Sequence, residues 1–197
     1  MSLSLWIVLA LAAALAAWAV VIYNRLVQLR NRIANAFGQI DVQLKRRYDL
    51  VPNLVEVAKR YLAHEADTLQ AVTRARTAAV GAADTVRHHP ASAPAIAALG
   101  AAEQALGTSL GRLMLVAEAY PELKADATMR SLSEELTSTE NRVGFARQAY
   151  NDEVLAFNDV ASQVPDALVA RMCGFAPAAM LQATQNAAER EAPRVAF

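Results

Sequence analysis

The sequence has few of the residues that interrupt helices, crosslink chains or carry catalysis. Its 197 residues include one cysteine, seven glycines and seven prolines, and only 6% are aromatic. The lone Cys173 excludes an internal disulfide, and the chain has no Cys/His cluster for structural zinc, so we expect a buried thiol. Lysine plus arginine and aspartate plus glutamate number 19 each, which removes the charge argument for a nucleic-acid partner. The composition, 55% apolar, favours an all-α fold.

One long apolar run stands at the start of the sequence. Residues 3–22 read LSLWIVLALAAALAAWAVVI, and Ser4 is the only polar side chain among them. As a helix this run extends about 30 Å, the thickness of the bilayer hydrocarbon. A cleaved signal peptide is the alternative, but the run is longer than a signal segment and no basic residue precedes it. We therefore expect an uncleaved transmembrane anchor over residues 1–23.

The charges beside this run predict its orientation. Six basic residues and one acidic residue lie between residues 24 and 48, whereas the other side carries only the α-amine. The positive-inside rule places the N-terminus outside and the remaining chain in the cytoplasm. We therefore expect a single-pass protein of the inner membrane. Arg25, Arg30 and Arg32 lie close enough to the span to contact anionic lipid.

Four amphipathic segments follow the anchor, with apolar residues recurring every three or four positions. Prolines fall outside these segments, as expected for residues that disrupt helix interiors. The first continues from the anchor to Arg47 as one rod of about 45 residues. The others run from Leu54 to Ala79, from Ile96 to Tyr120 and from Met129 to Val160. The segments are joined by short corners at residues 48–52 and near Pro121 and by a loop at 87–94. These connections predict an antiparallel, up-down-up-down four-helix bundle over residues 24–162, with coiled-coil-like packing.

Residues 163–197 form the third part of the chain. A short helix is expected over residues 165–175, PDALVARMCGF, with Gly174 as its stop. It can cap the open end of the bundle, which we favour, or lie on lipid through Leu168, Met172 and Phe175. Residues 184–197 lack periodicity, which predicts a mobile tail.

No pattern in the sequence indicates an enzyme. Inward Glu-x-x-His pairs, a Gly-rich phosphate loop, a GxSxG turn and a Cys/His nucleophile pair are all missing. His88 and His89 stand in a proline-broken loop, and His64 beside Glu65 reads as a polar break in the second helix. We expect no catalytic residue, cofactor, metal or small-molecule substrate.

The stretch KRRYDLVPN, residues 45–53, reads as a helix corner that carries additional polar groups. Its cations oppose the dipole of the preceding helix, and Asp49 can cap the next one, with Pro52 in its first turn. Such a corner does not account for Tyr48 beside two arginines. We expect a cluster at the cytoplasmic tip for a partner protein or subunit contact, made of Asp41, Gln43, Arg46, Arg47, Tyr48, Asp49, Asn53 and Glu56.

A second polar stretch, AYNDEVLAFND, lies in the fourth segment. It includes Tyr150, Asn151 and Asn158 on or beside an apolar stripe. Amides in such positions usually fix the register between helices, and we favour that role here.

Two long stretches and the chain's end carry a family resemblance. They are YNRLVQLRNRIANAFGQIDVQLKRRYDLVPNLVEVAKRY at residues 23–61, ENRVGFARQAYNDEVLAFN at 140–158, and the closing PRVAF. Together with the anchor they resemble the LemA family of bacterial membrane proteins. The resemblance implies a single-span anchor with a long antiparallel helical bundle, and it supplies no catalytic residue.

The expected function is a non-enzymatic membrane scaffold or adaptor. Its partners would be membrane lipid and either copies of itself or another membrane protein. Small residues in the anchor favour close packing between copies: Ala12, Ala13, Ala16 and Ala17. The alternative is a membrane-remodelling oligomer that acts on lipid through its C-terminal segment.

Overall fold

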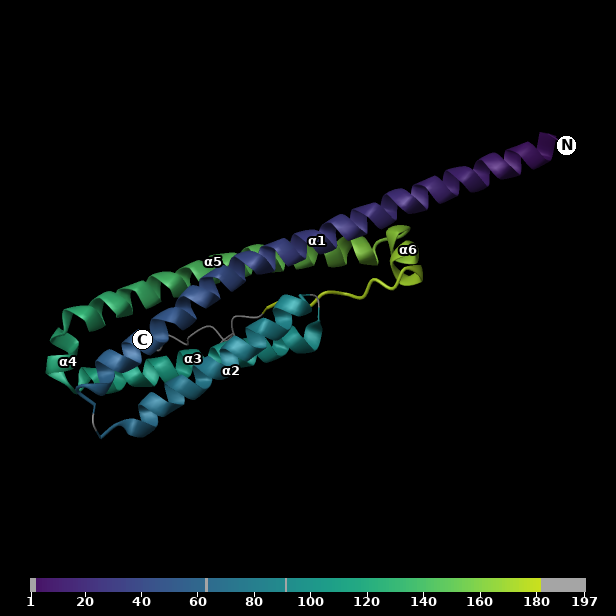
Figure 1. The fold of residues 1–197 in the computed structure, drawn as a ribbon. Helices are drawn as coiled ribbons and strands as arrows, with labels where there is room; N and C mark the ends of the chain where they lie inside the picture. The colour runs from purple at the N-terminus through teal and green to yellow at the C-terminus, as the bar shows by residue number, and fades with distance from the viewer. Residues whose placement is uncertain (1–2, 63, 91, 182–197) are drawn as a thin grey trace, which may run out of the picture.

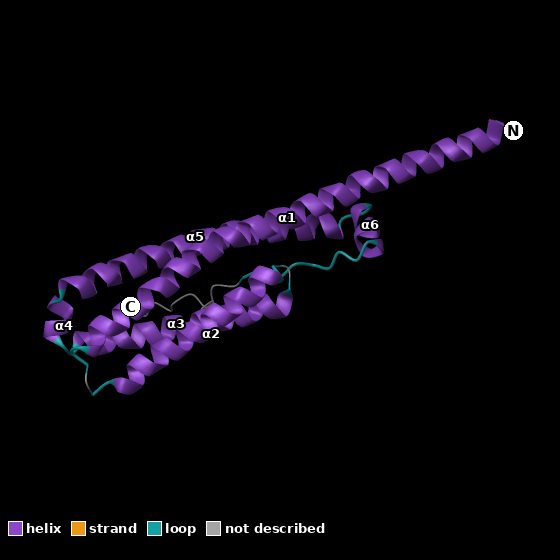
Figure 2. Ribbon diagram, viewed as in Figure 1, coloured by secondary structure: helices purple, strands orange, loops and turns teal. Residues whose placement is uncertain are grey.

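The fold is a group of long helices from which one apolar helix end projects (Figure 1). The computed structural model describes residues 3–62, 64–90 and 92–181. The described residues form helices joined by loops, which confirms the all-α expectation (Figure 2). In chain order the helices are α1 (Leu3–Lys59), α2 (Ala66–His88), α3 (Ala93–Glu118), α4 (Pro121–Ala125), α5 (Ala127–Ser162) and α6 (Asp166–Met172).

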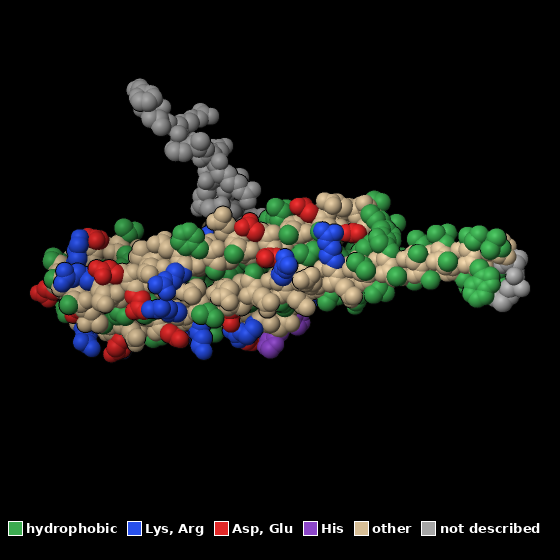
Figure 3. All heavy atoms as spheres, turned by 90° about the horizontal axis from the view of Figure 1, so that it is seen from above, with side chains coloured by type: hydrophobic (Ala, Val, Ile, Leu, Met, Phe, Trp, Pro, Cys, Tyr) green, Lys and Arg blue, Asp and Glu red, His purple; other side chains and the backbone are tan. Residues whose placement is uncertain are grey.

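Helix α1 connects the apolar run to the helical body without a break. Its 57 residues extend about 85 Å. Through residue 21 its side chains are almost all exposed, and this part is long and apolar enough to cross a membrane. From Ile22 onward, buried residues recur every three or four positions. The expected rod is therefore confirmed, and hydrophobic side chains cover its projecting end (Figure 3).

The corner expected at residues 48–52 is wrong, because α1 continues through Pro52 to Lys59. Proline has no N–H, so the carbonyl of Tyr48, four residues earlier, loses its helical donor. The Nε of Arg76 in α2 donates to that carbonyl oxygen at 2.6 Å instead. Asp49 consequently lies inside α1 and caps no helix.

The chain turns at residues 60–65, about ten residues later than expected. His64 and Glu65 lie in this turn and do not interrupt a helix. Leu54, expected to open the second helix, is instead a buried residue of α1. The third and fourth long helices, α3 and α5, agree with the sequence pattern to within a few residues.

Successive long helices run in opposite directions (Figure 1). Helix α1 packs against α5 and α2, and α2 packs against α3. The α1–α2 turn and α4 lie at the end away from the projecting apolar segment, while the α2–α3 loop and α6 lie near it (Figure 1). The helical body thus has one end beside the apolar span and one distant end.

Helix α6 ends in a glycine turn, as the sequence predicted. Gly174 has a φ of 73°, and the N–H of Phe175 donates to the carbonyl of Ala170 at 2.9 Å. This is the Schellman arrangement that satisfies carbonyls at a helix end. The chain then runs back without helical structure to Leu181. The expectation for residues 184–197 lies outside the described residues.

Candidate functional site

Arg47, Tyr48 and Glu103 form a buried polar cluster between α1 and α3. Arg47 Nη1 donates to Glu103 Oε2 at 3.0 Å, and the Tyr48 hydroxyl donates to Glu103 Oε1 at 2.5 Å. Burial and the neighbouring Glu103 carboxylate raise the pKa of Tyr48 far above its usual value, so the phenol stays neutral and donates. Arg47 and Tyr48 are only 5% and 4% exposed, and they join the two helices from inside.

The other members of the predicted interaction cluster are distributed around α1. Asp41 accepts from Arg87 of α2 at 3.0 and 3.1 Å, and Arg46 binds Glu135 of α5 at 2.6 Å. Gln43 is half-buried, and its Oε1 has no hydrogen-bond partner among the described residues. The structure therefore does not bring the predicted residues together as one surface cluster.

Four members of that cluster remain exposed on one strip of α1. Arg46, Asp49, Asn53 and Glu56 have the spacing of a single helix face, although Arg46 also pairs with Glu135 of α5. The strip lies in the last third of α1, toward the distant end of the body (Figure 1). It is the part of the predicted interaction cluster that a partner can reach.

Asn151 and Asn158 bind the chain that follows α6. The amide of Asn158 accepts from the Ala178 N–H and donates to the Ala178 carbonyl, both at 2.9 Å. Asn151 repeats the arrangement at Leu181, at 2.9 and 3.1 Å. Each side-chain amide therefore pairs with both the backbone N–H and the backbone carbonyl of one residue in the segment after α6.

Tyr150 adds a third contact to the same segment. Its hydroxyl lies 3.0 Å from the carbonyl of Ala179 and 3.3 Å from that of Pro90 in the α2–α3 loop. Burial raises the pKa of Tyr150 to about 12. The three polar residues singled out in the sequence thus hold the C-terminal segment, through contacts to its backbone. The spacing of seven between the two asparagines was the signal that they share one helix face.

Helix α6 lies against the base of the projecting segment. Arg25 Nη1 donates to Asp166 Oδ2 at 3.3 Å, next to the first buried residue of α1, Ile22. The ring of Phe175 packs edge-on against Tyr23, with centroids 5.7 Å apart, and lies near Phe157 at 6.3 Å. Phe175 is therefore half-buried among rings, with less surface available to lipid than predicted.

The outer face of α6 is apolar and exposed. Leu168 is 60% exposed and Met172 87%, whereas Ala167 and Ala170 are buried against the body. Cys173 is exposed, so the expected buried thiol is wrong. Cys173 is the C-cap that follows the seven residues of α6, and no further helical turn covers its side chain. The helix thus caps the body with one face and leaves the other free.

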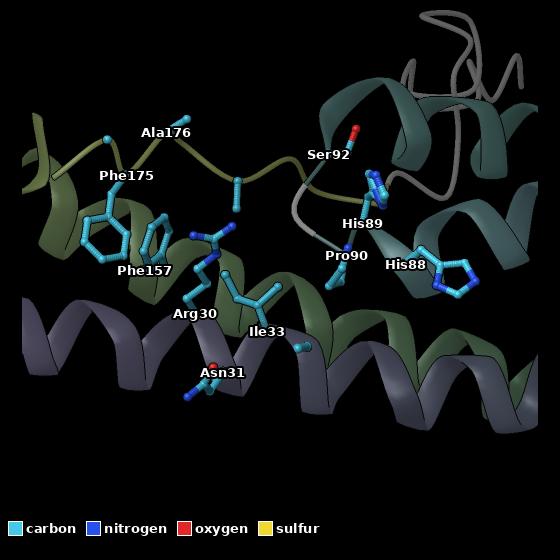
Figure 4. A pocket seen from close by; sticks show the side chains of 13 residues that line it. Arg30, Asn31, Ile33, His88, His89, Pro90, Ser92, Phe157, Phe175 and Ala176 are labelled. Atoms are coloured by element: carbon cyan, nitrogen blue, oxygen red, sulfur yellow. The ribbon is translucent and has the colours of Figure 1, made fainter.

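A cavity of about 550 Å³ opens between α1, the α2–α3 loop and the chain that leaves α6. Arg30, His88 and His89 contribute its basic side chains, and Phe157 and Phe175 contribute aromatic surface (Figure 4). Both histidines are exposed, as expected for the loop. Within the described residues, no group of three or more His, Cys, Asp or Glu side chains is arranged to hold a metal ion.

These features define a class of protein, a membrane-associated helical protein whose apolar span continues into its helical body. Residues 36–197 match the model of the LemA family, and the chain belongs to that family. It is similar to "Magnetosome protein MamQ 2" of Paramagnetospirillum magneticum (strain AMB-1), with 24% identity over 175 residues that cover 81% of this chain and 64% of that protein. Identity is also 24% over 168 residues to "Magnetosome protein MamQ" of Magnetospirillum gryphiswaldense (strain MSR-1), covering 78% of this chain and 62% of the relative. The chain thus spans less than two thirds of the length of these relatives.

Proposed function

We propose that this LemA-family protein is a non-enzymatic scaffold that self-associates or recruits other proteins at the inner membrane. In this proposal α1 crosses the bilayer with its N-terminus outside, and the helical body lies in the cytoplasm. The supporting observation is that one helix of 57 residues contains both the apolar span and the central helix of the body. The body is therefore held at a fixed direction relative to the span, as a scaffold requires.

Self-association within the bilayer is supported by the small residues of the span. The side chains of residues 3–21 are left almost entirely uncovered by the other described residues. Ala13 and Ala17 are exposed and lie one turn apart, so a second helix can approach closely there. Lipid or another helix must cover this surface.

The experiment is co-purification of two differently tagged full-length copies from the same membrane in mild detergent. The double variant Ala13→Leu/Ala17→Leu should reduce recovery of the second tag, because the larger side chains separate the helices. The control is Ala19→Leu, which adds one leucine on roughly the opposite side of the helix. Equal recovery from all three proteins would reject association through this face.

A second candidate function, remodelling of lipid by an oligomer, is supported by α6. The hydrogen bond from Arg25 to Asp166 attaches α6 to α1. Arg25 is only about 5 Å along the helix axis from Ile22, the first buried residue of α1. Its exposed side chains, Leu168 and Met172, are therefore available to enter the bilayer surface.

The single cysteine provides the test for this candidate. A polarity-sensitive fluorophore on exposed Cys173 of the full-length protein in nanodiscs should be quenched by nitroxide groups on the lipid headgroups or upper acyl chains. The matched control carries the cysteine at exposed Leu115 of α3, in the Cys173→Ser background. Lipid contact predicts quenching at residue 173 alone, and equal signals at both positions would reject it.

A further inference from the structure

The cavity beside Arg30 lies at a defined distance from the apolar span. Arg30 follows Ile22 by eight residues, or about 12 Å along α1. Helical side chains lean toward the N-terminus, which here is toward the membrane. The headgroup layer extends roughly 5–8 Å beyond the hydrocarbon on each side. A long arginine side chain at this position can therefore reach the level of lipid phosphates.

The polar side chains that line the cavity can all donate hydrogen bonds. Figure 4 shows the guanidinium of Arg30 beside the rings of Phe157 and Phe175, across from His89 and Ser92. No described carboxylate pairs with Arg30. An imidazole offers at least one N–H in either protonation state, so this set can bind an anion without a change in protonation.

Carboxylates are missing from the described lining of this cavity. In the neighbouring elements Asp166 pairs with Arg25, while Asp84 pairs with Arg87 and lies 3.9 Å from Nε2 of His88. A second cavity, between α1, α3 and α5, differs in this respect because Glu103 and Glu140 line it together with Arg47 and Arg147. Of these two cavities, the one at Arg30 lies nearer the apolar span and has no carboxylate in its described lining.

The remaining lining is apolar. Ile33, Phe157 and Phe175 supply aliphatic and aromatic surface beside the donors, and the nearby outer face of α6 exposes Leu168 and Met172. A ligand that fits both parts has a negative phosphate at one end and a hydrophobic portion at the other. Phospholipids have this chemistry, and the leaflet that α1 enters would supply them.

We propose that the cavity between Arg30, the α2–α3 loop and the chain after α6 binds the phosphate headgroup of an anionic phospholipid. Arg30 contacts the phosphate, and the aromatic wall packs against the glycerol and the upper part of an acyl chain. The site rests on the insertion of α1 in a membrane and does not depend on self-association.

The test titrates phosphatidylglycerol and phosphatidylcholine into the full-length protein in detergent and counts bound lipids by native mass spectrometry. Wild type should bind phosphatidylglycerol more tightly than phosphatidylcholine. Arg30→Gln should weaken phosphatidylglycerol binding at least about fivefold. Ala34→Phe, which fills the cavity at an exposed lining residue without changing charge, should also weaken it.

Arg32→Gln is the matched control. Arg32 is exposed on the same helix and pairs with no described carboxylate, but it does not line the cavity. Equal losses of phosphatidylglycerol affinity in Arg30→Gln and Arg32→Gln would show that general surface charge causes the effect. That result would overturn the proposed site. Displacement of phosphatidylglycerol by an equal concentration of glycerol phosphate would assign the cavity to a soluble phosphate and overturn the lipid proposal.

Discussion

Arg76 of α2 donates a hydrogen bond of 2.6 Å to the carbonyl of Tyr48 in α1. That carbonyl is the one left without a helical donor by Pro52. A side chain 28 residues away in sequence therefore replaces the bond that proline removes. Because of this replacement, α1 continues from the apolar span to Lys59 and can transmit the direction of the span to the body.

Arg76→Gln should destabilise the body by about 1.5–3 kcal/mol, the usual value of a hydrogen bond from a charged donor. In a Pro52→Ala background the same substitution should cost at least about 1 kcal/mol less, because the N–H of residue 52 again reaches the Tyr48 carbonyl. Chemical unfolding of the full-length protein in detergent, followed by circular dichroism, measures the cost of Arg76→Gln in each background. Arg74→Gln, at an exposed neighbouring position, is the control. Equal costs of Arg76→Gln in the two backgrounds would contradict this explanation of α1.

Glu103→Leu should be strongly destabilising, by about 3–5 kcal/mol, because Arg47 is then left as a buried charge with no anion. Arg47→Met/Glu103→Leu should be more stable than Glu103→Leu alone, since neither charge remains inside. Denaturant midpoints of the single and double variants provide the comparison. A double variant at least as unstable as Glu103→Leu would show that the ion pair does not explain the cost.

Asn158 should protect the Ala178 amide from hydrogen exchange, because the Asn158 side chain accepts from that N–H. Exchange of peptides covering residues 175–181 should be slowest in wild type, faster in Asn158→Asp and fastest in Asn158→Leu. Aspartate keeps the acceptor but loses the donor to the Ala178 carbonyl, and leucine loses both, at about 1 kcal/mol per bond. Asp152→Asn, at an exposed position of α5 nearly two turns away, should exchange like wild type. Unchanged exchange in Asn158→Leu would indicate that the two Asn158–Ala178 hydrogen bonds contribute little to holding this segment.

Asp126 gives the body an acid-sensitive contact. The backbone N–H of Met129 and the hydroxyl of Tyr61 bind this carboxylate and hold its pKa below its usual value. A lowered pKa in the folded state adds stability above the unfolded pKa of about 3.9, and this stability is lost as pH falls through the lower folded pKa. Asp126→Asn keeps a helix cap but removes the titration.

Melting temperatures of wild type and Asp126→Asn at about pH 6 and about pH 3 test this prediction. The variant should lose less stability on acidification than wild type. Asp49→Asn, at an exposed position of α1 away from this contact, serves as the control and should follow wild type. Identical losses in all three proteins would assign the acid sensitivity to other groups.

The periodic parts of the fold were predictable from local sequence. Helices α3 and α5 follow from apolar spacing, and the continuity of the span with the body follows from the lack of any polar loop after residue 22. The turn at residues 60–65 was missed because Pro52 is the stronger local break. What overrides it is the tertiary bond from Arg76, which no local pattern of α1 contains.

The polar residues were easier to locate than their partners. Tyr150, Asn151 and Asn158 stood out in the sequence, but the segment they bind follows α6 and consists mostly of alanine and proline, without a periodic signal. Tyr48 likewise stood out, yet its partner Glu103 belongs to α3 and is identified only once the helices are arranged in space. Long-range pairing therefore limited the prediction of sites more than residue identity did.

The mass of the full-length protein in nanodiscs, corrected for bound lipid, distinguishes a membrane-anchored scaffold from an isolated anchored protein. A scaffold should form a discrete assembly of several copies that shifts toward smaller masses in Ala13→Leu/Ala17→Leu. A strictly monomeric protein that also retains no other membrane protein when isolated under the same mild conditions would contradict the scaffold proposal.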